Sequence, residues 1–371
     1  MISNVEELVE AQPVAHSTQT TLGALTARVP RVAPLTVIVP AYNEASSIAD
    51  TVRSIQAQTL RPAEIVVVDD YSSDATGDIA RSLGVTVRRP PQNTGSKAGA
   101  QNFALTYANS PWVMAIDADT VLAPDAIEKL TAAFNDANVV AACGLVLPRH
   151  VQTVWERGRY IEYLFAFTFY KQVQDYYGKP GISSGCFSVY RTDVLKECGG
   201  WPSRTVAEDM DLTWTFYENG YHVRFIPEAV CYPIEPHDFG FMSKQLQRWS
   251  HGFIQNVKFH WRDVLHVPVL RYIVAVSVWD ATVTSVLYLF LIPALSLYLG
   301  TFWFLLAYLI DVPAVLVPVL AGAIPRREVG KAMASLPAFF VLRTVNAIFF
   351  MRAAYRELIA GRPLRSYEKG H

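Results

Sequence analysis

The sequence is 371 residues long, which is enough for one large domain or two of ordinary size. The formal net charge of −1 excludes bulk electrostatic binding of nucleic acid, so we expect no nucleic-acid partner. Hydrophobic residues make up 51% of the chain and are unevenly distributed: 1–265 has a globular composition, whereas 272–323 and 334–351 are nearly free of charge. This distribution indicates a globular domain followed by a membrane part.

The first part of the chain alternates between strand and helix patterns. Apolar runs at 35–39, 64–68, 85–87 and 112–116 predict buried strands, and helices are predicted at 44–58, from about 75 to 83, and at 98–108. This alternation predicts an α/β domain with right-handed βαβ units and a parallel sheet. Ligands bind such sheets at the carboxyl ends of the strands, where polar residues stand at 40–44, 69–70 and 117–119. These positions are the first indication of a nucleotide site.

Asp117-Ala-Asp119 follows the fourth predicted strand. Residues two apart on a strand point to the same face, so the two carboxylates are expected to lie side by side. Mg²⁺ or Mn²⁺ uses few carboxylates together with phosphate oxygens, and this pair is suited to a metal–diphosphate site. An isolated Asp-X-Asp is more often a solvated turn; the position at a strand end favours the metal interpretation.

Asp69 and Asp70 end the second strand and are candidates for hydrogen bonds to the base and ribose of a nucleotide. The alternative is turn chemistry, because Asp initiates turns through side-chain bonds to the backbone. Lys97 lies in a polar loop ahead of a helix, where backbone amides and a lysine can bind phosphate.

Glu208-Asp209 precedes an amphipathic run. Acidic residues in the first turn of a helix favour its macrodipole, and that is the structural alternative for both side chains. The functional interpretation is a general base that takes a proton from an acceptor hydroxyl.

Gln245-Leu-Gln-Arg248-Trp249 occupies a helical pattern in which residues three and four apart share a face. Arginine binds a diphosphate through two donors, and an indole offers a flat surface to a sugar ring. An interfacial helix with Arg and Trp at the bilayer boundary is the alternative, and both interpretations are compatible.

Three apolar segments follow, at about 272–296, 300–323 and 333–353, each long enough to cross a hydrocarbon core of about 30 Å. Basic residues at 326, 327 and 331 predict a cytoplasmic turn between the second and third segments. The tail after the third segment is also basic, which conflicts with three full crossings. Either the third element lies in the interface or one segment is re-entrant.

With these motifs, the chain resembles the membrane-integrated family-2 inverting glycosyltransferases, such as cellulose, chitin, hyaluronan and poly-N-acetylglucosamine synthases. The similarity covers roughly 35–260 and, more loosely, the membrane part. It rests on Ile38-Val-Pro40-Ala-Tyr42-Asn-Glu44, Val68-Asp69-Asp70, Lys97-Ala-Gly-Ala-Gln-Asn102, Asp117-Ala-Asp119, Ser184-Gly185-Cys186, Glu208-Asp209 and Gln245 through Trp249. The chain departs from the family pattern in Tyr71, where glycine is usual, and in Ser96, which is inserted before Lys97.

The resemblance implies a GT-A nucleotide-sugar-binding (Rossmann-like) fold, a UDP-sugar donor, a Mg²⁺ or Mn²⁺ cofactor and a glycan or lipid-linked acceptor. It implies catalytic roles for Asp209 as the base and for Glu208 and Arg248, and metal binding by Asp119 and Asp117. The implied nucleotide-binding residues are Pro40, Tyr42, Glu44, Asp69, Asp70, Lys97, Asp117, Gln245 and Arg248. The implied acceptor-binding residues are Trp249, Gly185 and Cys186.

The expected organisation is a flexible tail at 1–33, a glycosyltransferase domain at 34–262 with interfacial helices near its end, a membrane domain at 263–355 with two to three transmembrane helices, and a basic tail at 356–371. The chain is therefore expected to be a multi-pass protein of the cytoplasmic membrane with its catalytic domain in the cytoplasm. The expected reaction is metal-dependent inverting transfer of a sugar, processive or single, that forms a β-glycosidic bond. A nucleotidyltransferase and a catalytically inactive membrane scaffold are the rival interpretations.

Overall fold

The computed structural model describes residues 31–309 and 312–364, and only the backbone of Phe304 and Leu305. The expected N-terminal tail lies outside the described residues up to position 30, and its last three residues belong to the first strand. Part of the expected basic C-terminal tail, from 365 onward, also lies outside them.

The described residues form one eight-stranded sheet in the order β3-β2-β1-β4-β7-β6-β8-β5. The strands are β1 Arg31–Ala41, β2 Leu60–Asp69, β3 Thr86–Arg88, β4 Trp112–Ile116, β5 Thr120–Leu122, β6 Val139–Val146, β7 Phe187–Arg191 and β8 His222–Pro233. The first four predicted strands are confirmed in β1 to β4. They pair in parallel, as the βαβ pattern predicts.

The second half of the sheet is mixed. β7 is antiparallel to both β4 and β6, whereas β6 and β8 are parallel to each other. The short β5 pairs antiparallel with β8 at the edge of the sheet. Because two reversals restore the direction, β6 and β8 end at the same edge as β1, β2 and β4.

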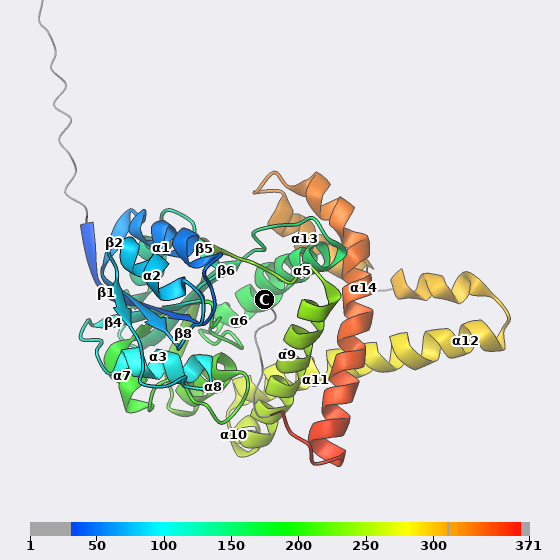
Figure 1. The fold of residues 1–371 in the computed structure, drawn as a ribbon. Helices are drawn as coiled ribbons and strands as arrows, with labels where there is room; N and C mark the ends of the chain where they lie inside the picture. Colours follow the sequence, from blue (N-terminus) through cyan, green and yellow to red (C-terminus); the bar gives the residue numbers. More distant parts are fainter. Residues whose placement is uncertain (1–30, 310–311, 365–371) are drawn as a thin grey trace, which may run out of the picture. The chain divides into compact units, whose positions relative to one another are not determined.

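Helices cover both faces of the sheet (Figure 1). Before the membrane part they are α1 Ile48–Gln56, α2 Thr76–Ser82, α3 Lys97–Leu105, α4 Ala126–Thr131, α5 Val154–Phe165, α6 Lys171–Tyr176, α7 Thr192–Glu197, α8 Glu208–Glu218, α9 Phe239–Phe259 and α10 Trp261–His266. The alternation of β1 divides the core, because Val37 and Val39 pack in one cluster with α1 while Ile38 packs in the other with α3.

The C-terminal part contains long apolar helices. They are α11 Pro268–Val286, which continues through the π-helix Leu287–Leu291 into α12 Ile292–Tyr298, then the 3-10 helix η4 Phe302–Leu309, α13 Val312–Ala323 and α14 Val329–Ala354, which ends in the π-helix Tyr355–Ile359. Three candidate membrane segments, Pro268–Tyr298, Leu306–Ala323 and Val329–Ile359, are long and apolar enough to cross a bilayer by length and composition. The predicted fold class, an α/β domain followed by apolar C-terminal helices, is confirmed.

The apolar helices share a core with the α/β domain. Val315 and Val319 of α13 and Phe339 of α14 belong to the same buried cluster as Val37 of β1. α5 lies against both α13 and α14 (Figure 1). The hydrophobic core is therefore continuous across the expected domain boundary at 262.

Candidate active site

Three acidic and basic side chains from separate elements meet at the carboxyl edge of the sheet. Lys97, the first residue of α3, forms an ion pair with Asp117, which follows β4, and its ammonium lies 3.8 Å from Oε1 of Glu208. The same ammonium donates a hydrogen bond of 3.0 Å to the carbonyl of Gly185. Lys97, Asp117, Glu208 and Gly185, all predicted site residues, are therefore neighbours.

The residue before Lys97 explains why the helix begins there. Ser96 is the N-cap of α3, and its hydroxyl accepts a hydrogen bond of 3.1 Å from the backbone N–H of Gly99. This serine, which is inserted relative to the family pattern, thus fixes the first turn of α3 and the position from which the Lys97 side chain extends.

Asp209 and Glu208 begin α8 and lie in different surroundings. Asp209 is half-buried, and its Oδ2 accepts a hydrogen bond of 2.9 Å from the N–H of Gly185. Glu208 is buried, and burial raises the pKa of its carboxyl. Lys97 and Arg248 lower this pKa electrostatically, and the Asp209 charge raises it. Arg248 is therefore close enough to Glu208 to interact with it electrostatically.

Asp69 and Asp70 hold the loops around the site. Oδ1 of Asp69 accepts from the N–H of Ser72 at 2.9 Å. The Asp70 carboxylate accepts from the N–H and from the hydroxyl of Thr94, both at 2.8 Å. Both aspartates thus make the turn interactions that were the alternative interpretation, and they shape the loop that leads to Lys97.

The turn after β1 presents the other predicted nucleotide-binding residues. Glu44 is buried and accepts a hydrogen bond of 2.9 Å from the Ser47 hydroxyl, whereas Tyr42 is 53% exposed. Pro40 pairs in register with Val68 of β2, which brings this turn beside the end of β2.

Asp117 and Asp119 lie in the turn between β4 and β5 and not within a strand. The two aspartates were expected to lie on one strand and to point to the same face of the sheet, and that expectation is wrong. Asp119 is buried and its Oδ1 accepts from the Thr120 hydroxyl at 3.2 Å, while Asp117 is half-buried beside Lys97. Two carboxylates with oxygen donors fit a hard divalent cation that takes its remaining ligands from phosphate and water.

Gln245 and Trp249 lie against a buried arginine of α5. The Arg159 guanidinium donates to Oε1 of Gln245 at 2.5 Å and lies 4.3 Å from the centroid of the Trp249 ring. Arg159 is fully buried and also forms an ion pair with Glu162. Gln245 and Trp249 therefore share one support, as their spacing on a helix predicts.

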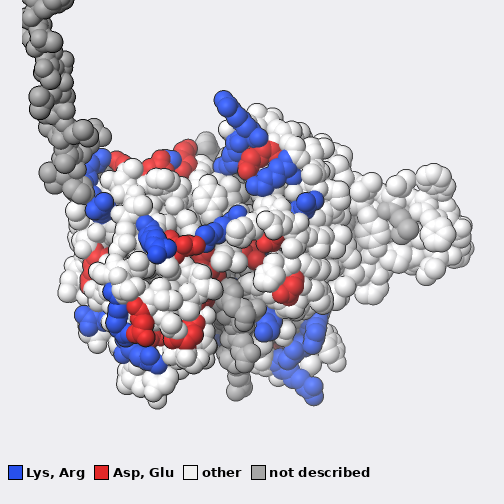
Figure 2. All heavy atoms as spheres, turned by 45° about the horizontal axis from the view of Figure 1, so that its top comes forward, with Lys and Arg blue, Asp and Glu red and all other residues white. Residues whose placement is uncertain are grey.

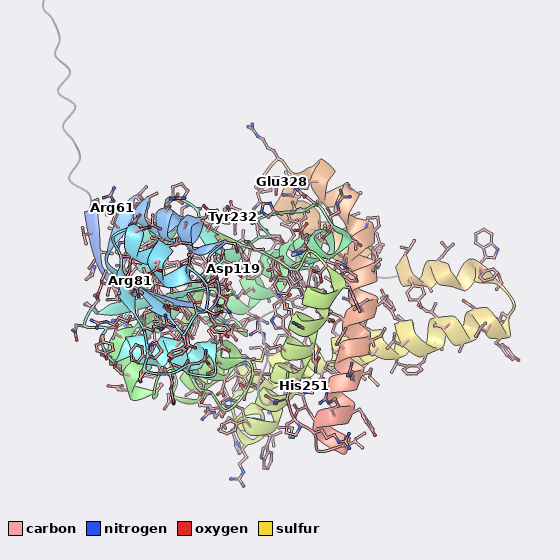
Figure 3. The ribbon with its side chains drawn as sticks, in the orientation of Figure 1. Arg61, Arg81, Asp119, Tyr232, His251 and Glu328 are labelled. Carbon is pink, nitrogen blue, oxygen red and sulfur yellow. The ribbon has the colours of Figure 1, made fainter. Side chains whose placement is uncertain are left out.

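Glu235 is a buried acid at this site that the sequence analysis did not single out. Its Oε1 accepts from the Tyr163 hydroxyl at 2.7 Å, and its Oε2 lies 3.5 Å from Nε of Arg159. Burial raises the pKa of Glu235 to about 7, against the effect of Arg159. Glu235 follows β8, so the pattern of acids after strands could have identified it. Asp119, which is labelled in Figure 3, lies nearby, because its carbonyl accepts a hydrogen bond from the N–H of Ile234.

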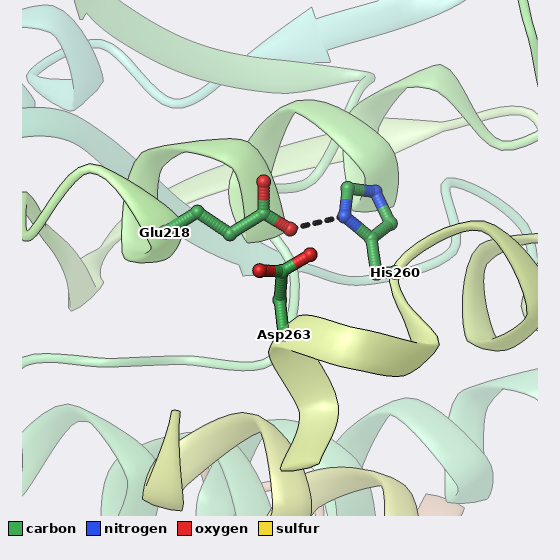
Figure 4. A group of neighbouring side chains, drawn as sticks. All are labelled: Glu218, His260 and Asp263. Carbon is green, nitrogen blue, oxygen red and sulfur yellow. Dashed lines mark hydrogen bonds and ion pairs between the residues drawn. The ribbon is translucent and has the colours of Figure 1, made fainter. Parts of the chain in front are cut away.

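Behind α8, a histidine network joins the two helices that carry the motifs. His260, the C-cap of α9, contacts Glu218 of α8 through Nδ1 and Asp211 of α8 through Nε2, the latter at 2.9 Å. Glu218, His260 and Asp263 bring potential ligand atoms within 4.8 Å of one another (Figure 4). Both ring nitrogens already contact carboxylates, so these interactions account for the cluster as an ion-pair network.

Comparison with known proteins shows which proteins the chain is similar to. Residues 36–199 match the family model described as Glycosyl transferase family 2. A poly-β-1,6-N-acetyl-D-glucosamine synthase of Staphylococcus aureus (strain COL) is 27% identical over 222 residues, which cover 59% of this chain and 54% of that protein. The synthase of the same name from Staphylococcus epidermidis is 27% identical over 228 residues, with the same coverage. The chain thus spans about half the length of the curated relatives it matches.

A solved structure agrees over most of the chain. A mannosyltransferase from Pyrobaculum calidifontis, in complex with GDP-Man and Mn²⁺, is 21% identical, has a TM-score of 0.58 and aligns over 90% of each chain. This similarity concerns the fold, including its C-terminal helices. The expected resemblance is confirmed over residues 36–199, which match Glycosyl transferase family 2, and the chain has a GT-A-like α/β domain followed by apolar helices.

Proposed function

We propose that the chain is a metal-dependent, inverting glycosyltransferase that transfers a sugar from a UDP-sugar to a glycan or lipid-linked acceptor at the cytoplasmic face of the membrane. The observation that carries this proposal is the meeting of Lys97, Asp117, Glu208 and the Gly185–Asp209 pair at one edge of the sheet. A nucleotide diphosphate, a metal and an acceptor hydroxyl are the components that such a set of groups would bring together.

The donor pocket would be formed by the turns after β1 and β2. Asp69 and Asp70 hold these turns in place, and exposed polar groups there would bind the base and ribose. Lys97 would bind the diphosphate, because it is the first residue of α3 and the N-terminal end of a helix favours negative charge. We propose an N-acetylhexosamine or a hexose as the transferred sugar; the names of the staphylococcal relatives support the former.

Asp119 and Asp117 would hold Mg²⁺ or Mn²⁺. When bound, the cation supplies charge stabilisation to the diphosphate oxygens. Asp117 would exchange part of its interaction with Lys97 for this role, and the buried Asp119 is held by the Thr120 hydroxyl.

Asp209 would act as the base. It would accept the proton of the acceptor hydroxyl while that oxygen forms a bond to the anomeric carbon and the bond from this carbon to the diphosphate oxygen breaks. One displacement by one base inverts the anomeric configuration, so an α-linked donor would yield a β-linked product. Glu208, whose pKa is raised by burial, would lie beside the base.

Arg248 would stabilise the negative charge on the departing nucleotide, and Gln245 would contact the same diphosphate. Trp249 would carry the acceptor sugar on its ring, oriented by Arg159, and the Gly185-Cys186 loop would line the acceptor end of the site.

The test is nucleotide release from a panel of UDP-, GDP- and dTDP-sugars by detergent-purified protein with Mn²⁺. The Asp209→Asn variant is assayed in parallel, since its side chain keeps the size but loses the base. We expect UDP release from one donor, at least about 100-fold slower in the variant, with UDP binding retained. The exposed Asp78→Asn variant on α2 is the matched control and should be fully active.

Release of pyrophosphate instead of a nucleoside diphosphate would replace the proposal with a nucleotidyltransferase. No release with any donor, even after addition of membranes from the source organism, would favour the inactive scaffold.

A further inference from the structure

The last apolar helix is held at both ends by the α/β domain. Before its first turn, Glu328 accepts a hydrogen bond of 2.8 Å from the Tyr160 hydroxyl of α5. After its last turn, Glu357 contacts Nδ1 of His251 at 2.7 Å and accepts from Nε2 of Gln255 at 2.7 Å, both on α9. Figure 3 labels Glu328, at the start of α14, and His251 of α9, which contacts the segment after its end.

Between these ends α14 lies along the same two helices. Gly158 of α5 lies against Leu342 and the carbonyl of Ala338, and Leu342 packs with Met242 and Leu246 of α9. α14 and α9 run side by side (Figure 1). A helix of 26 residues is about 39 Å long at 1.5 Å per residue. The domain thus accompanies α14 over a distance greater than the hydrocarbon thickness of about 30 Å.

The helices that lie along α14, α5 and α9, carry exposed charges that make it unfavourable for α14 to cross the bilayer. Arg157 of α5 and Lys244 of α9 are exposed. If α14 crossed the bilayer, α5 and α9 would enter it too, and each such charge costs about 3 kcal/mol or more at the bilayer centre. Basic side chains also stand at both ends of α14, Arg326 and Arg327 before it and Arg352 and Arg356 near its end. Basic residues favour the cytoplasmic side, so both ends match the same side.

A second element is suited to enter the bilayer. Residues 281–310 contain no charged residue, and Figure 2 shows the corresponding projection free of charged side chains. At its base, Tyr288 and Tyr308 exchange hydrogen bonds, each hydroxyl donating to the other's carbonyl, at 3.2 and 2.8 Å. At its tip, Tyr298 is 87% and Phe302 84% exposed. We call residues 288–309 the apolar hairpin.

The length of the hairpin sets how deeply it can enter. Its outgoing arm makes ten helical steps from Tyr288 to Tyr298, about 15 Å. That distance is half of the hydrocarbon core. Behind the base, α11 crosses α14, where Arg343 donates to Asp280 and to Thr284, both at 2.9 Å. An ion pair at this depth fits the headgroup boundary better than the bilayer centre.

We propose that this chain binds the lipid surface of one leaflet without crossing the bilayer: α14 lies in the interface plane, and the apolar hairpin inserts into the acyl chains of that leaflet only. The loop before α14, the segment after it and the catalytic site are then on the same side. The third apolar segment, Val329–Ile359, then lies in the interface, which agrees with the basic tail after it. The first two, Pro268–Tyr298 and Leu306–Ala323, form a re-entrant pair.

The test is sided labelling of single-cysteine variants with a membrane-impermeant maleimide. Gly330→Cys reports the start of α14, where an added side chain meets open space, and Arg362→Cys reports the exposed segment after it. The unsubstituted chain, with its four free cysteines, gives the background. Inverted vesicles expose the cytoplasmic side and spheroplasts the opposite side. Unchanged nucleotide binding identifies folded variants.

Both cysteines should react at least tenfold faster in inverted vesicles than in spheroplasts. If the cysteine at 362 reacts faster in spheroplasts while that at 330 does not, α14 crosses the membrane and the proposal is overturned.

The depth of the hairpin is tested with a fluorophore on Tyr298→Cys in liposomes. Quenching by lipids with nitroxides on their acyl chains, without quenching by aqueous iodide from either side, supports insertion into one leaflet. Iodide quenching from the side opposite the catalytic domain would show that the tip has crossed. Absence of lipid quenching, with a dimer in solution, would assign the hairpin to a second copy of the chain. Either of the last two results overturns the proposal.

Discussion

Gly185 donates its backbone N–H to Oδ2 of Asp209 at 2.9 Å, so the loop before β7 orients the first turn of α8. The contact is close enough to require glycine, because a Cβ at position 185 would lie 2.8 Å from the same oxygen. The orientation of the proposed base therefore depends on a residue 24 positions earlier in the chain.

Gly185→Ala should lower the rate of sugar transfer about 10- to 100-fold, because displacing Asp209 by less than 1 Å misaligns the proton acceptor. Nucleotide affinity should change less than threefold. The measurement is kcat for the active donor beside the dissociation constant of UDP. Gly330→Ala, at an exposed glycine with open space around it, is the control and should be fully active. Full activity of Gly185→Ala would contradict this role.

Asp119→Ala should weaken UDP binding in Mn²⁺ by at least about tenfold, because a hard cation loses a carboxylate ligand. Chelator should reduce binding to the unsubstituted chain to a similar level and have little further effect on the variant. Calorimetric titration with UDP, with and without chelator, measures both. If binding to the unsubstituted chain survives in chelator, the metal assignment is wrong.

Arg159→Met should lower the free energy of unfolding by about 3–5 kcal/mol, because Glu162 and Glu235 lose the cation between them. Arg157→Met on the exposed side of the same helix is the matched control, with an expected change below about 0.5 kcal/mol. Denaturant unfolding in detergent gives both values. Adding Glu235→Gln to Arg159→Met should recover part of the loss. Equal stability of the two single variants would show that the buried arginine does not support the site.

Stability should fall at mildly alkaline pH because of His260. Burial lowers the pKa of this histidine, but its contacts with Asp211 and Glu218 outweigh that effect and raise the pKa from 6.5 to about 9. A raised folded-state pKa contributes stability that is complete below about 6.5 and is lost as pH rises to about 9. The loss is on the order of 3 kcal/mol. The melting temperature from pH 6 to 9.5 checks this, and His260→Gln should flatten the profile; an equally steep profile in that variant would refute the assignment.

The first half of the sheet could be predicted because its signals are local. Apolar strands such as 64–68 end at polar turns, and parallel strands bring those turns to one edge. The spacing of Gln245 and Trp249 on a helix likewise predicts that they share a neighbour.

The partners across the fold could not be predicted in this way. Arg159 lies 86 residues before Gln245, and α5 has an unremarkable amphipathic pattern. The position of Glu235 after a strand makes it a candidate, but the direction of β8 depends on two antiparallel pairings, so nothing local indicates that Glu235 lies at the same edge as Asp117. The strand directions are set by pairing between segments that are far apart in the sequence, so local patterns do not predict them.

Tyr71 departs from the family pattern, and its backbone adopts a positive φ angle. Its φ of 72° lies in the left-handed region that favours glycine, the residue usual in the family at this position. The Arg89 guanidinium lies 4.7 Å from the centroid of its ring, and Arg89 also donates to Asp69 at 3.2 Å. Tyr71 thus adopts the backbone conformation that glycine favours, and its ring adds a contact with Arg89 beside the end of β2.

The continuous core has a consequence for how this enzyme can be studied and regulated. Phe339 and Val319, from the apolar helices, pack in one cluster with residues of the central strands. A version cut after residue 262 would leave that surface of α5 open to water and should aggregate. Lateral pressure or lipid composition acting on α14 would also reach Gln245 and Trp249 through α9, since the helices are packed together. With the proposed placement of α14 at the lipid surface, the bilayer would therefore affect the conformation of the candidate site as well as its location.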